Sequence, residues 1–233
     1  MIPLKDNIPS RTVPWVNYAL IALNLTVFGY ELTLGPDLEG FIFTYGFVPA
    51  GIHAHWLSPT WLTSLFLHGG WWHILANLLY LWIFGDNVED RMGHVRYLVF
   101  YLLCGLTANV AQYYAGPSQA VPTLGASGAI AGVLGAYFVL YPYARILTLV
   151  PIFFFIQFFQ IPAVFFLLIW FVQQFLLGTY SLGTHAGGGV AWWAHVGGFA
   201  AGFALVGLFQ KRSRRPTRSD FWPRRRGRFY RIR

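Results

Sequence analysis

The sequence is short of charge and of cysteine. Charged residues make up 10% of its 233 residues, whereas an average soluble domain carries roughly 25%. Cys104 is the single cysteine, which excludes an intrachain disulfide framework. Hydrophobic residues make up 56% and aromatic residues 19%, which excludes a disordered chain and disfavours an ordinary soluble enzyme. The composition therefore predicts a membrane protein that crosses the bilayer several times.

The net charge of +8 is unevenly distributed. Eleven of the sixteen Lys and Arg residues lie in 211–233, whereas 1–210 holds five bases and seven acids. A basic protein suggests nucleic-acid binding. These bases directly follow an apolar segment, however, and that arrangement is typical of a cytoplasmic anchor on anionic lipid. We therefore expect membrane lipids as partners of this tail, and no nucleic acid.

Six segments are apolar and long enough to cross a bilayer, which requires about 20 residues each. They are 14–34, 66–85, 95–115, 124–142, a helix from about Ile161 inside the uncharged stretch 146–177, and 190–210. The first segment is too long for a cleavable signal peptide and lacks a small-residue cleavage site. Pro151 and Pro162 interrupt the uncharged stretch, so we expect Pro151 to Gln160 to lie at the membrane interface.

The loop charges predict the orientation of these six segments. The loops 35–65, 116–123 and 178–189 contain no Lys or Arg, and all sixteen basic residues fall on the opposite side. Cytoplasmic loops carry the excess of basic residues in membrane proteins. We therefore predict an all-α membrane protein with both termini in the cytoplasm. Its parts are a cytoplasmic segment (1–13), a six-helix membrane domain (14–210) and a basic tail (211–233).

Polar side chains gather near the outer ends of three of these segments. Asn77 and His73 lie in the second, Ser127 in the fourth and His195 in the sixth. Polar groups inside a membrane are costly and are functional candidates by default. Serine becomes a nucleophile when a neighbouring base takes its proton. The acids all lie outside the fourth and sixth segments, so we expect a Ser127–His195 dyad whose imidazole is held by packing.

The neighbouring residues fit such a site. The pairs Gly128-x-x-x-Gly132 and Gly198-x-x-x-Gly202 would let two helix backbones approach closely. His73 and Asn77 are spaced i, i+4 and share one helix face. Beside Ser127 they would stabilise a developing oxyanion, together with the Ser127 backbone N–H.

Three motifs in order, HGGWWHILANLLYLWIFGDNVEDRMG, GASG and AHVGGFAAG, resemble the rhomboid family of intramembrane serine proteases. The N-terminal IPLKDNIPSRTVPWVNYALIALN is similar to the bacterial-type branch. The resemblance implies a rhomboid-like bundle in a bacterial plasma membrane that cleaves transmembrane segments of proteins near the outer face, without a cofactor. It implies Ser127 as nucleophile, His195 as general base, and an oxyanion hole of His73, Asn77 and Ser127. The expected cavity-lining residues are His68, Gly125, Ala126 and Gly128.

Two positions depart from patterns seen in some rhomboid proteases. The first loop, 35–65, contains no Arg, although some members carry a Trp-Arg pair there. Ala131 stands one turn after Ser127, where some members place an aromatic ring under the catalytic imidazole. The second departure concerns how the imidazole is supported.

Other interpretations stay open. Ser127 alone would more often be a packing residue, and His195 alone a buried, satisfied histidine. His68 either lines the cavity or lies at the interface, and His53, His55, His68 and His73 lack the carboxylate, cysteine or HExxH pattern of a metal site. The alternative functions are a catalytically silent rhomboid-like protein that binds membrane helices, and a transporter. For a protease, we expect substrate to enter between the second and fifth segments, with Phe166→Ala as a test.

Overall fold

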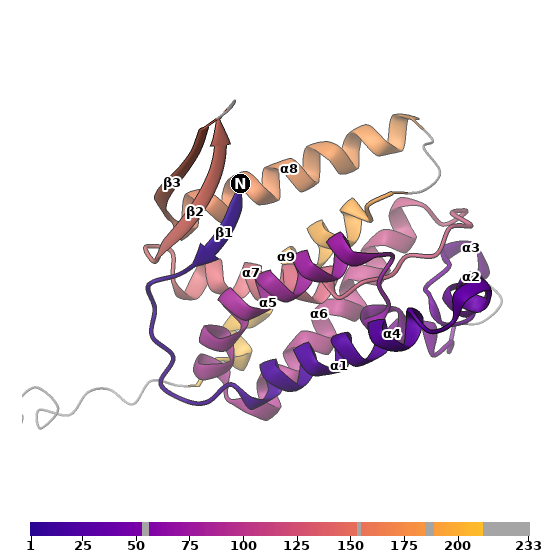
Figure 1. Cartoon of the computed structure of the whole chain (residues 1–233), viewed down its shortest axis with the longest axis horizontal. Coiled ribbons are helices and arrows are strands. Elements are labelled where there is room, and N and C mark those ends of the chain that lie inside the picture. The colour runs from indigo at the N-terminus through magenta and orange to yellow at the C-terminus, as the bar shows by residue number, and fades with distance from the viewer. Residues whose placement is uncertain (53–55, 153–154, 185–188, 212–233) are drawn as a thin grey trace, which may run out of the picture.

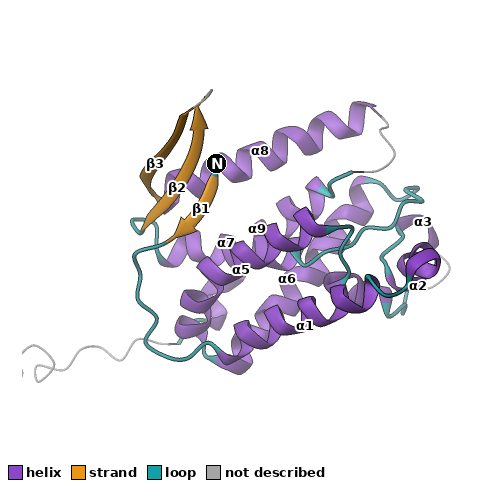
Figure 2. Ribbon diagram, in the orientation of Figure 1, coloured by secondary structure: helices purple, strands orange, loops and turns teal. Residues whose placement is uncertain are grey.

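A computed structural model describes residues 1–52, 56–152, 155–184 and 189–211. It is mostly helical, and a long helix lies in each of the six predicted segments (Figures 1 and 2). The six long helices are α1 (Trp15–Glu31), α5 (Trp71–Met92), α6 (His94–Ala115), α7 (Ser127–Leu140), α8 (Ala163–Thr184) and α9 (Trp192–Phe209). Helices α6, α7 and α9 pack tightly together, and α8 runs along one side of the bundle (Figure 1).

Three of the described helices are long and apolar enough to cross a membrane, namely α6, α8 and α9. Helix α1 counts as a fourth if it forms one broken span with the residues up to Tyr45, from which it is bent by 114°. Helix α7 is apolar but has only 14 residues, and α5 carries charged residues in its last two turns. The chain is therefore a multi-pass membrane protein, and the count of six crossings stays a prediction.

A three-stranded antiparallel sheet stands at one end of the bundle (Figure 2). It consists of β1 (Ile2–Lys5), β2 (Arg145–Ile152) and β3 (Phe155–Pro162), in that spatial order. The mostly helical fold agrees with the prediction, but the sheet was not predicted, because we expected Pro151 to Gln160 only to lie at the membrane interface. The β-branched and aromatic residues of 145–162 favour strands, and Pro162 ends the outer strand, where proline is tolerated. Pairing with β1 comes from the far N-terminus and has no local signal.

The first loop is folded into short helices. They are η1 (Gly35–Asp37), α2 (Leu38–Tyr45), α3 (Pro49–Ile52), α4 (Thr60–Thr63) and η2 (Ser64–Phe66). This loop bonds to the segment that precedes α7. The backbone of Phe47 exchanges two hydrogen bonds with Thr123, and the Ser64 carbonyl accepts from Gly125 N–H at 2.9 Å. The first loop therefore holds the approach to Ser127.

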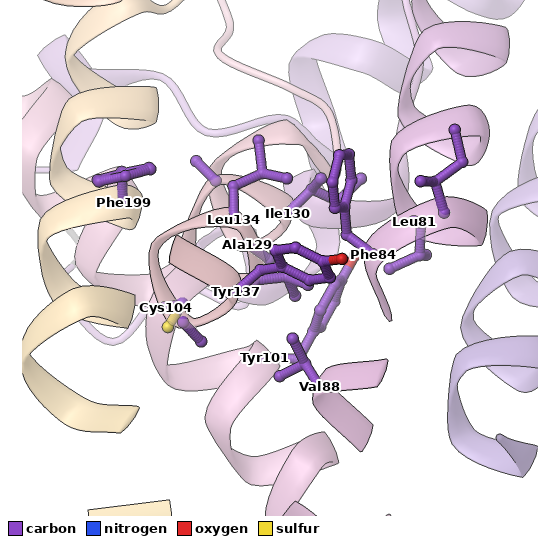
Figure 3. Packing of buried hydrophobic residues seen from close by; sticks show 14 of the residues in the cluster. Leu81, Phe84, Val88, Tyr101, Cys104, Ala129, Ile130, Leu134, Tyr137 and Phe199 are labelled. Atoms are coloured by element: carbon purple, nitrogen blue, oxygen red, sulfur yellow. The ribbon is translucent and has the colours of Figure 1, made fainter. Parts of the chain in front are cut away.

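The core fills the space between α5, α6, α7 and α9 (Figure 3). The rings of Tyr137 and Phe84 are fully buried and contact each other edge to face, with their centroids 4.9 Å apart. Tyr101 and Leu134 extend the same cluster. Tyr137 follows Ser127 by ten residues on α7, which is about 15 Å along the helix. This core therefore holds α7 along its length, from Ala129 near Ser127 to Tyr137.

Carboxylates join the helices at the end of the bundle that holds the C-termini of α5 and α7. Glu89 of α5 is fully buried, and its two oxygens accept the backbone N–H groups of Val16 and Asn17. These are unpaired donors at the start of α1, so Glu89 caps that helix from α5. Asp6 accepts hydrogen bonds from the Tyr137 hydroxyl and Asn87, and burial raises the pKa of this carboxyl.

Helices α7 and α9 approach each other through their glycines. A Cβ built on Gly198 would lie 2.0 Å from the Gly128 carbonyl oxygen, and one on Gly202 would lie 1.9 Å from the Gly132 oxygen. No side chain fits into such a contact. The predicted role of the two small-x-x-x-small pairs is therefore confirmed, and the helix that carries His195 lies directly against the helix that carries Ser127.

Candidate active site

Ser127 is the first residue of α7. The segment before it is fixed by the hydrogen bonds to the first loop, and Gly125 has a φ of +118°. Residues with a Cβ rarely adopt this backbone conformation. Glycine therefore permits the turn that starts the helix. The chain changes from loop to helix here, which leaves the Ser127 side chain on the first turn.

His195 lies on the second turn of α9 with its ring toward Ser127. His195 Nε2 and Ser127 Oγ are 2.7 Å apart, which is hydrogen-bonding distance. His195, Gly198 and Gly202 follow an i, i+3, i+7 spacing and share one face of the helix. The glycine contacts therefore set the distance between the hydroxyl and the imidazole.

The imidazole is held by more than packing, which corrects our expectation. Gln174 of α8 places Oε1 2.8 Å from His195 Nδ1. Trp170, one turn earlier on α8, has its ring 5.9 Å from the imidazole, with 34° between the two planes. The Trp192 ring meets the imidazole edge-on at 6.2 Å. Aromatic support thus comes from α8 and α9 instead of position 131 on α7.

Sequence reasoning missed both Gln174 and Trp170. A signal for Gln174 was present, since an amide inside an uncharged 32-residue stretch is a polar group at membrane depth. Its partner was not visible, because the contact joins residues of two helices, and these residues are 21 positions apart in sequence.

His73 and Asn77 lie on α5 next to Gly125. A Cβ on Gly125 would lie 2.6 Å from His73 Nε2 and 3.7 Å from Asn77 Nδ2. Both nitrogens therefore point at the turn that leads into Ser127. Asn77 is buried, and its Nδ2 has no hydrogen-bond partner within the described residues. An unpaired buried donor is costly, so this amide is available to an oxygen that the chain itself does not provide.

A cavity of about 710 Å³ connects these groups. Ser127, His195, His73 and Asn77 all lie in its wall, so the structure brings the four main predicted side chains to one space. The remaining lining is mostly apolar and includes Trp72, Ala76, Tyr80, Ile130, Leu134 and Trp170. Within the described residues, the lining contains no Asp, Glu, Lys or Arg. The arrangement can bring a hydroxyl, a base and an amide donor to one bond of a bound chain.

The Rhomboid domain family matches residues 55–212, about two thirds of the sequence. The chain belongs to the rhomboid family. Among curated proteins, it is 35% identical over 124 residues to Rhomboid protease GluP of Bacillus subtilis (strain 168), which covers 53% of this chain and 24% of that protein. It is 31% identical over 138 residues to the mitochondrial Rhomboid protein 1 of Saccharomyces cerevisiae, covering 57% and 38%.

A third similar protein is Putative rhomboid protease YdcA of Bacillus subtilis (strain 168), 36% identical over 76 residues, which cover 33% of this chain and 38% of that protein. The matches thus span less than two fifths of each of these relatives. The family carries over to this rhomboid chain, and the names of two of these three relatives describe them as rhomboid proteases, one of them putative.

Four residues expected to line the cavity of this rhomboid chain do not lie in its wall: His68, Gly125, Ala126 and Gly128. His68 is buried, with its Nδ1 3.2 Å from the Phe66 carbonyl and its backbone N–H donated to Glu31. Gly128 faces α6, where a Cβ would lie 2.5 Å from that of Ala108. Packing inside the bundle therefore accounts for His68 and Gly128.

The residues considered for a metal site are only partly described. His53 and His55 lie outside the described residues. The rings of His68 and His73 contact each other edge to face, and their centroids are 5.2 Å apart. The part of the chain that the structure describes contains no group of three His, Cys, Asp or Glu side chains that could hold a metal ion.

Proposed function

We propose that this chain is an intramembrane serine endopeptidase that cleaves transmembrane segments of membrane proteins near the outer face. The observation that carries the proposal is the 2.7 Å contact between Ser127 Oγ and His195 Nε2 in the wall of the cavity. Membership of a family with protease-named relatives supports the same reaction class.

In this mechanism, His195 Nε2 takes the proton of Ser127 as Oγ attacks the substrate carbonyl carbon. The C–N bond of the tetrahedral intermediate then breaks, and His195 gives the proton to the departing amine. Water, activated by His195, next attacks the acyl-enzyme and releases the acid. The peptide bond must leave its helix first, because helical carbonyls are hydrogen-bonded. Substrates with small or helix-breaking residues near the outer face are therefore preferred.

The oxyanion hole is proposed to consist of Asn77, His73 and the Ser127 backbone N–H. Gly69 N–H approaches His73 Nδ1 at 3.4 Å, so Nδ1 acts as acceptor and the ring proton belongs on Nε2. His73 Nε2 and Asn77 Nδ2 are then two donors directed at the same turn.

Replacing Asn77 with alanine is expected to lower kcat by about 10²–10³-fold, the usual loss for one oxyanion donor. The KM should change little, because the bond forms mainly with the developing charge. Asn7→Ala is the matched control, since Asn7 is exposed and accepts a hydrogen bond from the Arg145 backbone N–H outside the cavity. A kcat within threefold of wild type for Asn77→Ala would remove this residue from the proposed hole.

Substrate is proposed to enter between α5 and α8, the predicted second and fifth spans. The cavity wall there includes Trp72, Ala76 and Tyr80 of α5 and Trp170 of α8. Phe166, our first choice of probe, is buried against Phe84 in the core, so its truncation would test stability instead of access.

Trp72 is the better probe, because its side chain is 86% exposed at the rim of the cavity. We expect Trp72→Ala to change the cleavage rate of membrane-embedded substrates by several-fold and to leave a short water-soluble peptide substrate unaffected. Equal effects on both substrates, or none, would argue against this route.

We further propose six crossings with both termini in the cytoplasm of a bacterial plasma membrane. The absence of Lys and Arg from 35–65, 116–123 and 178–189 supports this orientation. The basic tail would lie on the anionic inner leaflet; apart from Lys211 it falls outside the described residues. The same assignment of six crossings divides the chain into the cytoplasmic segment 1–13, the membrane domain 14–210 and the basic tail 211–233.

Labelling with a fluorophosphonate probe tests the proposed chemistry. The purified protein in detergent should be modified once, and mass spectrometry of its peptides should locate the adduct on Ser127. Cleavage of a model transmembrane substrate should be lost in step with labelling. A folded protein that neither labels nor cleaves would instead favour the catalytically silent protein that binds membrane helices.

A further inference from the structure

The Gln174 side chain of α8 is oriented by two hydrogen bonds. It is only 5% exposed, and its Nε2 donates to the Trp170 carbonyl at 3.3 Å. Because an NH₂ group must face that carbonyl, the amide oxygen faces His195. Oε1 then lies 2.8 Å from His195 Nδ1. An amide oxygen accepts but never donates, so the contact requires a proton on His195 Nδ1.

This requirement selects one tautomer of the imidazole. A neutral imidazole with its proton on Nδ1 has its lone pair on Nε2. His195 Nε2 is the atom that faces Ser127 Oγ, so the selected tautomer is the one that can accept the serine proton. The opposite tautomer would place a second donor against the hydroxyl and would be inactive as a base.

We propose that Gln174 is a positioning residue for His195, which fixes the tautomer and the ring orientation in place of the carboxylate of a catalytic triad. This inference rests on the proposed function, because it assigns the orientation of the proposed base. Trp170 holds the face of the same ring from the preceding turn of α8. Helix α8 therefore carries both supports for the imidazole.

The neutral amide has a consequence for pH dependence. The side chains that face His195 are Ser127 of α7, Gln174 and Trp170 of α8, Trp192 of its own helix and His73 across the cavity. Among these described side chains, His73 is the one further imidazole and there is no carboxylate. A carboxylate at position 174 would favour the charged imidazolium, which is the protonated and therefore inactive form of the base.

The test compares three variants in detergent with a model transmembrane substrate. Gln174→Leu should lower kcat by on the order of 10–100-fold with little change in KM, a part of the 10²–10⁴ that general-base catalysis contributes. Gln174→Glu keeps an acceptor for Nδ1, so it should regain most of the activity. Its low-pH limb of kcat/KM should lie at higher pH than in wild type. Gln173→Leu changes the neighbouring exposed glutamine and should have wild-type kinetics.

The outcomes separate this inference from the proposed function. If the wild-type protein cleaves and labels at Ser127 while Gln174→Leu matches its kcat and pH profile, the positioning role is overturned and the serine protease remains. If the wild-type protein neither labels nor cleaves, the proposed function itself fails. If Gln174→Leu does not fold, Gln174→Glu decides, because an unchanged low-pH limb would contradict the role and a shifted limb would support it.

Discussion

Cleavage of a transmembrane substrate is expected to fall by about 10⁴-fold or more when Ser127 is replaced with alanine. Removing the nucleophile of a serine protease has an effect of this order, and what remains comes from binding and the oxyanion hole. The measurement is the initial cleavage rate of a substrate reconstituted with the enzyme in lipid vesicles. His195→Ala should give a loss of similar size, because without a base the hydroxyl stays protonated.

The two residues should act as one unit. The double variant Ser127→Ala with His195→Ala should be no slower than either single variant, since each alone already removes the covalent route. Ser58→Ala is a matched control, because Ser58 bonds to Thr60 in the first loop, away from the cavity. Substantial cleavage by Ser127→Ala would mean that another group attacks the substrate. Additive losses in the double variant would mean that the two side chains act independently.

The four side chains that meet at the cavity could be predicted because each is a costly polar group in an apolar segment. Ser127, His195, His73 and Asn77 also lie in motifs of fixed order, so their common depth followed from the helix assignment. Gln174 is equally polar and equally deep. It was missed because its role depends on how α8 turns against α9, which no spacing within one helix reveals.

The sheet was missed for a related reason. The stretch 145–162 has no charge after Arg145 and adjoins a spanning helix, so hydropathy assigns it to the membrane boundary. Hydropathy does not distinguish a strand from an irregular segment. The register that joins Ile2 to Leu149 links the N-terminus to the middle of the polypeptide, and long-range pairing of this kind leaves no periodic signal in either segment.

The close packing of α7 on α9 predicts that a single methyl group at Gly202 is severely destabilising. The Cβ of Gly202→Ala would lie 1.9 Å from the Gly132 carbonyl oxygen, and a backbone oxygen in a helix cannot rotate away. Overpacking of this kind costs about 3 kcal/mol, which corresponds to a fall in Tm of about 6–12 °C for a chain of this size. Thermal unfolding in detergent measures it.

Gly207→Ala is the matched control on the same helix, because nothing lies within 4 Å of the Cβ position there. Alanine favours a helix over glycine by about 1 kcal/mol, so this variant should unfold at the wild-type temperature or slightly above it. Gly202→Ala should also lose cleavage, since wider spacing of α7 and α9 separates Ser127 Oγ from His195 Nε2. A wild-type Tm for Gly202→Ala would contradict the glycine contact, and a lower Tm with full activity would show that this contact does not set the distance between the two side chains.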